Sequence, residues 1–184
     1  GMNETGVTGT ESGNCNWYKV AAVCIIAAGC LAYANTLTNG FVWDDASSLL
    51  LHKHVQDPTK FFRLFAEDQH AFGRGQGNFY RPLVSVSFML DFFFTRPNDW
   101  VPQAGIPNPN PALYHITNTL WHILAALGFL ALLRRMGAPV GVWMTAPLLF
   151  VAHPLHTEAI TYISGRADPM SAAFMFAAVC LALP

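Results

Sequence analysis

Residues 17–37 read WYKVAAVCIIAAGCLAYANTL, and this run decides the class of fold. Lys19 is its only charged residue, and a helix of about 20 apolar residues crosses ~30 Å of hydrocarbon. We therefore predict a first membrane span over 17–37. The rival interpretation is a secretory signal peptide, because Ala32-Tyr33-Ala34 resembles a small-residue cleavage site. We favour the span, since the segment is retained in the chain.

The composition also indicates a membrane protein. Hydrophobic residues make up 53% of the 184 residues and charged residues 11%, whereas a soluble domain carries about 25% charged residues. The mean hydropathy is +0.32. A net charge of -1 gives no reason to expect a nucleic-acid partner. The four cysteines form no CxxC pair, so we expect neither a disulfide framework nor a zinc site built on them.

Three further apolar blocks follow the first span. Together the four blocks predict an all-α polytopic membrane fold with about four spans. Beyond the first span, we expect them at residues 113–133, 139–152 and 169–184. The third is short and contains Pro147, so we expect its helix to continue past the proline with a kink. The fourth reaches the last residue, which predicts the N-terminal part of a larger enzyme. Residues 1–16 are assigned to an N-terminal tail, with Gly1 interpreted as a scar of tag removal.

Basic residues predict the orientation of the spans. Lys19 flanks the first span and Arg134-Arg135 follow the second, which assigns both of these ends to the cytoplasm. The polar interval 38–112 and the turn 153–168 then lie together on the opposite side of the membrane. The interval holds six of the ten bases, but long loops translocate largely regardless of charge. We expect a multi-pass protein of the bacterial inner membrane, or of the endoplasmic reticulum in a eukaryote.

The large extracytoplasmic first loop is expected to carry two short amphipathic helices. Asp57-Pro58 has the pattern of an N-cap followed by a first-turn proline. A helix after it would gather three aromatic side chains on one face, those of Phe61, Phe62 and Phe65. Arg81-Pro82 opens the second helix, PLVSVSFMLDFFF. Between them the glycine-rich stretch 72–78 is expected to be flexible.

Two adjacent carboxylates, Asp44 and Asp45, follow the first span. Such a pair could act as a general base or hold a divalent cation. The alternative is a helix start, because the sequence DDASS resembles an N-cap with a first-turn acid. The dipeptide alone favours capping, and a metal ion is not favoured.

The turn between the third and fourth expected spans concentrates ionisable groups, namely His153, His156, Glu158, Arg166 and Asp168. Ionisable groups at a membrane boundary are costly, so they are usually functional or mutually paired. We keep two compatible interpretations, a hydrogen-bond network that closes the turn and a substrate-phosphate site. Zinc is disfavoured, because the spacing fits no standard pattern.

Other polar residues have simpler interpretations. His115, Asn118 and His122 share a face of the second span, where such side chains usually hold helices together. Arg81 could contact a phosphate, but an arginine that snorkels to the membrane interface is the default.

Four strings in unbroken order carry a family resemblance: FVWDD, YRPL, NPALYHITNTLWH and LLFVAHPLHTEAITYISGRAD. Over residues 35–180 the chain resembles the polytopic GT-C glycosyltransferases. It is most similar to the transmembrane O-mannosyltransferases that carry C-terminal tetratricopeptide repeats, and to their bacterial relatives. Such enzymes have many more spans than this chain.

The resemblance implies a sugar donor on a polyprenyl phosphate, a protein or glycan hydroxyl as acceptor, no cofactor, and inversion at the anomeric carbon. Asp44 or Asp45 would receive the acceptor proton. Arg166, Arg81 and the two histidines of the turn are candidates to hold the departing phosphate, with Glu158 and Asp168 as further substrate contacts. The alternative is a non-catalytic polytopic scaffold or assembly factor with the same helices.

Overall fold

The computed structural model describes residues 8–69, 79–96, 98 and 106–183, with the backbone alone for residues 8–15. Over these residues the regular elements are all helical, and no strand occurs among them. The all-α prediction is therefore confirmed. The glycine-rich stretch 72–78, predicted to be flexible, lies outside the described residues.

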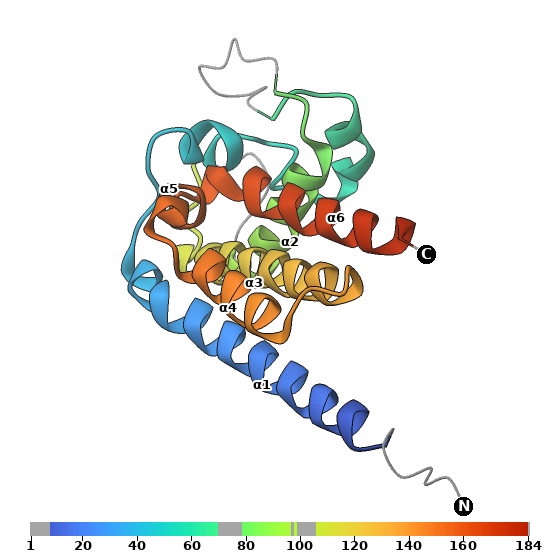
Figure 1. The fold of residues 1–184 in the computed structure, drawn as a ribbon. Coiled ribbons are helices and arrows are strands. Elements are labelled where there is room, and N and C mark those ends of the chain that lie inside the picture. Colours follow the sequence, from blue (N-terminus) through green and yellow to red (C-terminus); the bar gives the residue numbers. More distant parts are fainter. Residues whose placement is uncertain (1–7, 70–78, 97, 99–105, 184) are drawn as a thin grey trace, which may run out of the picture.

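Four helices form the main bundle (Figure 1). They are α1 (Thr8–Ala32), α3 (Pro111–Arg135), α4 (Val140–Ala152) and α6 (Ala167–Ala182). Helix α3 is central, because it packs against each of the other three, while α1 also packs against α4. The start of α1 and the ends of α3 and α6 lie toward the right of Figure 1, and the turn carrying α5 lies at the left.

Two helical segments are long and apolar enough to cross a membrane, Asn16–Thr38 and Pro111–Arg135. They coincide with the first two predicted spans. Helices α4 and α6 have 13 and 16 residues and are shorter, so the third and fourth spans and the orientation stay predictions. Helix α1 begins at Thr8, ahead of the predicted start at Trp17, and part of the predicted tail is therefore helical.

The ends of the central helix α3 follow from local sequence. The side chain of Asn110 accepts a hydrogen bond from the N–H of Ala112 at 2.9 Å, and Pro111 occupies the first turn. At the other end Gly137 takes a φ of 73°, and the next N–H donates to the carbonyl of Leu133 at 3.0 Å. This is a Schellman-type ending, which favours glycine.

Helix α4 continues past Pro147, as predicted. The chain then reverses through three short helical turns, η4 (Pro154–His156), α5 (Thr157–Thr161) and η5 (Ile163–Arg166).

The first loop is folded rather than extended. It contains η1 (Ala34–Thr38), η2 (Ala46–Leu50), η3 (Pro58–Phe65) and α2 (Pro82–Thr95). Asp57 caps η3 as predicted, since its carboxylate accepts from the N–H of Thr59 at 3.0 Å. The ring of Phe61 contacts those of Phe62 and Phe65, and all three are exposed, which agrees with the predicted aromatic face.

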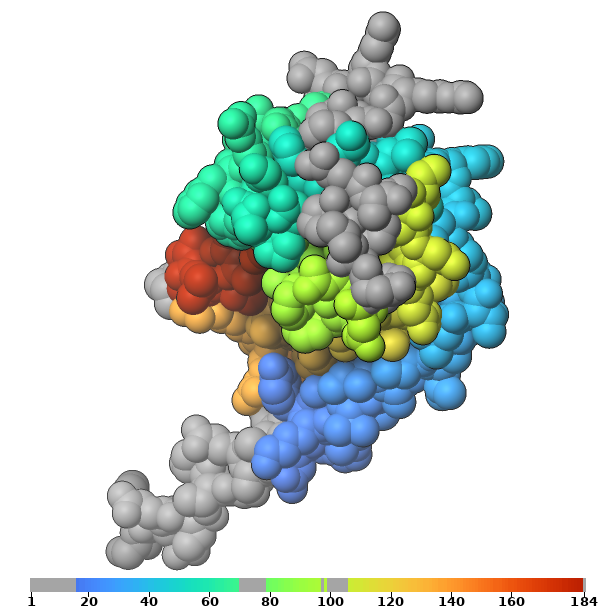
Figure 2. Space-filling model, turned by 180° about the vertical axis from the view of Figure 1, so that it is seen from behind, coloured from blue at the N-terminus to red at the C-terminus, as the bar shows by residue number. Residues whose placement is uncertain are grey.

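Two apolar clusters fix these parts. One holds α1, α3 and α4 together and includes Ile25, Ile123 and Val151. The other packs the loop elements onto the first turns of α3 and α6, with Leu64, Phe88 and Met170 among its members. The first loop therefore forms a layer over one end of the helices. In Figure 2 this layer, in teal and green, lies at the end of the molecule away from the start of α1.

Candidate functional site

Asp45 joins the first loop to the turn that precedes α6. It is completely buried. One carboxylate oxygen accepts from the N–H of Val42 at 2.9 Å, and the other accepts from the N–H and the hydroxyl of Ser164 at 2.8 and 2.7 Å. Burial raises the pKa of Asp45, while these hydrogen bonds act in the opposite direction. Both oxygens are therefore engaged within the protein, one of them by Ser164, which lies 119 residues away in sequence.

Asp44, by contrast, is exposed and lines a cleft. Its backbone N–H donates to the hydroxyl of Tyr162 at 3.1 Å, a contact across 118 residues of sequence. Burial, together with the two neighbouring aspartates, raises the pKa of Tyr162 to about 12. The preceding residue, Trp43, has a φ of 46°, a left-handed conformation that is costly for a bulky side chain. The bend at Trp43 thus comes immediately before two carboxylates with different environments.

The cleft has a volume of about 550 Å³. Its charged or titratable lining side chains come from the loop, the turn and the start of α6: Asp44, Arg81, His156, Glu158, Tyr162 and Asp168. The predicted convergence of the first loop and the 153–168 turn is thus present, and five of the eight predicted site residues share one cavity. We attribute this to the Asp45–Ser164 contacts, which tie the two segments together.

The two nitrogen donors in the cleft have different origins. Arg81 precedes α2 and is half-buried, with its guanidinium 5.0 Å from the centroid of the Phe79 ring. His156 ends η4, and its ring centroid lies 4.7 Å from that of Phe150. Burial lowers the pKa of His156, and the nearby His153 lowers it further. His156 is therefore mainly neutral near pH 7, with one N–H to donate.

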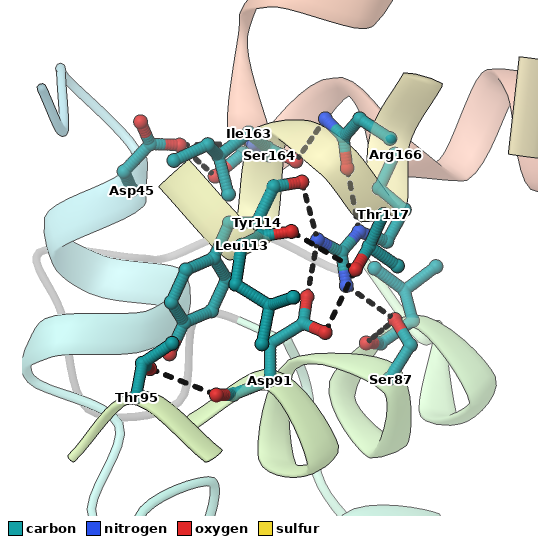
Figure 3. A network of polar contacts seen from close by, with 12 residues as sticks. Asp45, Ser87, Asp91, Thr95, Leu113, Tyr114, Thr117, Ile163, Ser164 and Arg166 are labelled. Carbon is teal, nitrogen blue, oxygen red and sulfur yellow. Dashed lines mark hydrogen bonds and ion pairs between the residues drawn. The ribbon is translucent and has the colours of Figure 1, made fainter. Parts of the chain in front are cut away.

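Arg166 lies outside this cleft, in a buried network (Figure 3). Its guanidinium pairs with the carboxylate of Asp91 at 2.6 Å. It also donates to the side-chain oxygen of Asn118 at 2.6 Å, the hydroxyl of Ser87 at 3.0 Å and the carbonyl of Tyr114 at 3.0 Å. The ring of Phe88 lies 4.5 Å from it. Its side chain is 0% exposed, so no donor of Arg166 reaches a ligand in this conformation.

This network connects three elements. Asp91 comes from α2, Asn118 from α3, and Arg166 ends η5, the turn that also carries Ser164. Asn118 further donates to three carbonyls of the turn, those of Ile160, Tyr162 and Ile163. The network therefore holds in place the backbone that binds Asp45.

The two histidines of α3, His115 and His122, make packing contacts, as predicted. His115 bonds the carbonyl of Asn39 and His122 that of Val151, each at 3.2 Å. His153 is exposed and does not line the cleft; its ring nitrogen accepts from the N–H of Leu155 and caps η4. Within the described residues, no three His, Cys, Asp or Glu side chains gather in a way that could hold a metal ion.

Sequence reasoning missed Tyr162, Ser164 and Asp91. The signal for Asp91 was available, because it is the one acid inside the apolar run PLVSVSFMLDFFF, and a lone charge there needs a partner. Nothing in the sequence marked Ser164 or Tyr162, because their roles depend on contacts with the distant loop.

Comparison with known proteins gives consistent relatives. The chain is similar to the protein O-mannosyl-transferase TMTC3 of Mus musculus, with 32% identity over 166 residues, which is 89% of this chain and 16% of that protein. It is also 32% identical to tmtc2 of Xenopus laevis over 84% of the chain and 18% of that protein. Tmtc2 of Drosophila melanogaster is 33% identical over 74% of the chain and 14% of that protein.

The chain thus spans less than a fifth of the length of these three relatives. No family model and no solved structure matches it. All three relatives are animal proteins, so they give no support to the predicted bacterial inner membrane. The chain is homologous to the N-terminal part of TMTC-type protein O-mannosyl-transferases, which confirms the resemblance drawn from the motifs.

Proposed function

We propose that this chain, a homologue of the N-terminal part of protein O-mannosyl-transferases, forms the base-bearing part of a membrane glycosyltransferase. The enzyme transfers a sugar from a polyprenyl-phosphate donor to a hydroxyl acceptor, a protein Ser or Thr, on the non-cytoplasmic side of the membrane. One observation carries the proposal: an exposed carboxylate, Asp44, shares a cleft with two nitrogen donors, Arg81 and His156.

Asp44 is assigned as the general base. As the acceptor oxygen attacks the anomeric carbon, its proton passes to the Asp44 carboxylate. Asp45 is a poor candidate for this step, because both of its oxygens already accept hydrogen bonds and it is buried. A carboxylate is a weak base for an alcohol, so the proton moves late, when the new bond is well advanced.

Arg81 and His156 are assigned to the leaving group. The bond between the anomeric carbon and the phosphate oxygen breaks, and its electron pair stays on the lipid phosphate. N–H donors stabilise that developing charge most strongly when they are already in place. Glu158 and Asp168 line the same cleft and are assigned to the hydroxyls of the sugar. Carboxylates accept hydrogen bonds, which suits a sugar that carries several hydroxyl groups as hydrogen-bond donors.

Arg166 takes a different role from the phosphate contact that the sequence suggested. Its burial and its ion pair with Asp91 support a positioning role, exerted through Ser164 and Asp45. His153 flanks His156 at a ring-centroid distance of 6.1 Å and would act on the phosphate only through it.

The two apolar helices of membrane length support a membrane setting. We place the protein in a multi-pass arrangement in which the cleft opens on the non-cytoplasmic surface. That surface is the periplasmic face of a bacterial inner membrane or the lumenal face of the endoplasmic reticulum.

The test is Asp44→Asn in the full-length protein. Removing a general base lowers the rate by about 10² to 10⁴-fold, and the exposed carboxylate contributes little to folding. Sugar transfer from a polyprenyl-phosphate donor to a Ser/Thr peptide is the measurement. Asp57→Asn is the matched control, because Asp57 is a cap outside the cleft and asparagine caps equally well.

The outcomes separate the proposal from the scaffold alternative. A scaffold would tolerate Asp44→Asn, and unchanged transfer by a folded protein would refute the assignment of the base. Asp45→Asn should instead reduce folding yield, because it weakens the contacts to Ser164.

A further inference from the structure

A second cavity lies at the opposite end of the bundle from the cleft. It has a volume of about 410 Å³ and is lined by Tyr18, Ala131, Arg134, Arg135 and Cys180. These residues come from the start of one membrane-length helix, the end of the other, and the end of α6. In Figure 2 the dark blue atoms of α1, which begin after residue 15, and orange atoms from the region around residue 140 lie near each other at the lower left.

The two arginines are held in place but keep their charge uncompensated. The guanidinium of Arg134 lies 4.6 Å from the centroid of the Tyr18 ring, which fixes its plane while its N–H edges stay available. Arg135 donates one N–H to the carbonyl of Leu183 at 2.6 Å. Both side chains are exposed. Across the described part of the chain, the one arginine in an ion pair is Arg166.

The helix dipole does not account for this arrangement by itself. A cation in the last turn of α3 is favourable, and it needs neither a cavity nor an aromatic ring to be so. Lys19, also exposed, adds a third positive charge at this end of α1. No acidic residue occurs within the sequence ranges 16–37 and 113–152 that bring these cations together.

The surroundings of the cavity are apolar. Val20 and Val23 of α1 are 46% and 64% exposed. A ligand with its anionic group on the arginines would therefore have hydrocarbon-compatible surface beside it. A soluble phosphate would leave this surface uncovered.

We infer that this cavity binds the phosphate of an anionic phospholipid from the adjoining leaflet. Two guanidinium groups can donate several N–H bonds to phosphate oxygens, and basic cavities at the ends of membrane helices suit such headgroups. The acyl chains would run along the exposed valine face of α1. This proposal does not depend on the proposed sugar transfer, and a negative result for one leaves the other unaffected.

The experiment uses the full-length protein in phosphatidylcholine nanodiscs, titrated with phosphatidylglycerol, with bound lipid counted by native mass spectrometry. One arginine near an anionic headgroup is worth about fivefold in affinity. Arg134→Gln/Arg135→Gln should therefore weaken binding about 25-fold. The matched control is Lys60→Gln/Arg63→Gln, which removes two exposed charges from η3 and should leave the titration unchanged.

Three results would overturn the inference. Equal losses in both double variants would indicate general surface attraction. An unchanged titration for Arg134→Gln/Arg135→Gln would mean that the arginines do not bind the headgroup. Binding of glycerol 3-phosphate to the wild-type protein as tightly as phosphatidylglycerol would identify a soluble ligand. Should the double variant fail to fold, Arg134→Gln alone must weaken binding about fivefold, and no change would refute the site.

Discussion

Replacing Asp91 with asparagine removes the negative partner of a guanidinium that has no exposed surface. In the wild-type protein the carboxylate of Asp91 lies 2.6 Å from Arg166 and also accepts from the hydroxyl of Thr117 at 2.9 Å. Asparagine nearly preserves the shape of the side chain, so the change removes the negative charge and one of the two acceptor oxygens without leaving a cavity. Arg166 would then keep its positive charge in a buried site with only neutral acceptors around it.

The expected cost is large. Removing one partner of a buried ion pair destabilises a protein by about 3–5 kcal/mol, against a typical total stability of about 5–15 kcal/mol. We therefore expect Asp91→Asn to lose roughly a fifth or more of the free energy of unfolding. The loss should appear first in the turn before α6, because Arg166 anchors it through Asn118 and Tyr114.

The assay is unfolding in detergent micelles, followed by hydrogen exchange of the backbone amides of residues 160–168. Asp57→Asn serves as the control, since it makes the same chemical change at a surface cap. The double variant Asp91→Leu/Arg166→Met should recover part of the loss, because it leaves no uncompensated charge. An Asp91→Asn protein with wild-type unfolding and exchange would refute the argument that this pair holds the turn.

Three further predictions concern packing, pH and topology. A Cβ on Gly29 would lie 2.5 Å from a side-chain carbon of Ile123, whereas one on Gly141 would meet nothing within 4 Å. Gly29→Ala should thus cost about 1–3 kcal/mol and Gly141→Ala should not, as judged by unfolding in micelles. Burial lowers the pKa of His52 from 6.5 to about 4. The folded protein therefore favours the neutral form of His52. The contribution of this neutral form to the free energy of unfolding is complete above pH 6.5 and is lost as the pH falls through about 4. The loss is about 3 kcal/mol; His52→Gln should flatten the stability profile over that range, and an unchanged slope would contradict the assignment. Finally, introduced cysteines at Lys60 and Thr157, in a background without native cysteines, should react with an impermeant reagent from the same, non-cytoplasmic side; labelling from opposite sides would contradict the predicted orientation.

Several local features were predictable because they depend on neighbours in the sequence. The cap at Asp57, the aromatic face of η3 and the continuation of α4 past Pro147 each follow from a few adjacent residues. The predicted number of four membrane spans has less support than these local features. Apolar composition identifies α4 and α6 as helices, but their lengths of 13 and 16 residues fall short of the two membrane-length segments.

The candidate site was predicted in part. The motifs placed Asp44, Arg81 and the turn residues together, and the cleft contains most of them. The prediction for Arg166 named the residue but not its surroundings, because its partner Asp91 lies in an apolar helix 75 positions earlier in the sequence. An arginine in a turn looks the same in sequence whether it faces a ligand or a buried carboxylate.

By itself, the sequence determined that the chain is helical, with two segments long and apolar enough to cross a membrane, since hydrophobic run length and turn chemistry are local quantities. It also limited the candidate site residues to a few carboxylates and basic side chains. Only the tertiary structure distinguished Asp44 from Asp45. Adjacent and chemically identical, they differ because Ser164, brought from 119 residues away, engages one carboxylate and leaves the other in the cleft. Burial and hydrogen bonding depend on which distant groups arrive at a side chain, and the folded chain decides this.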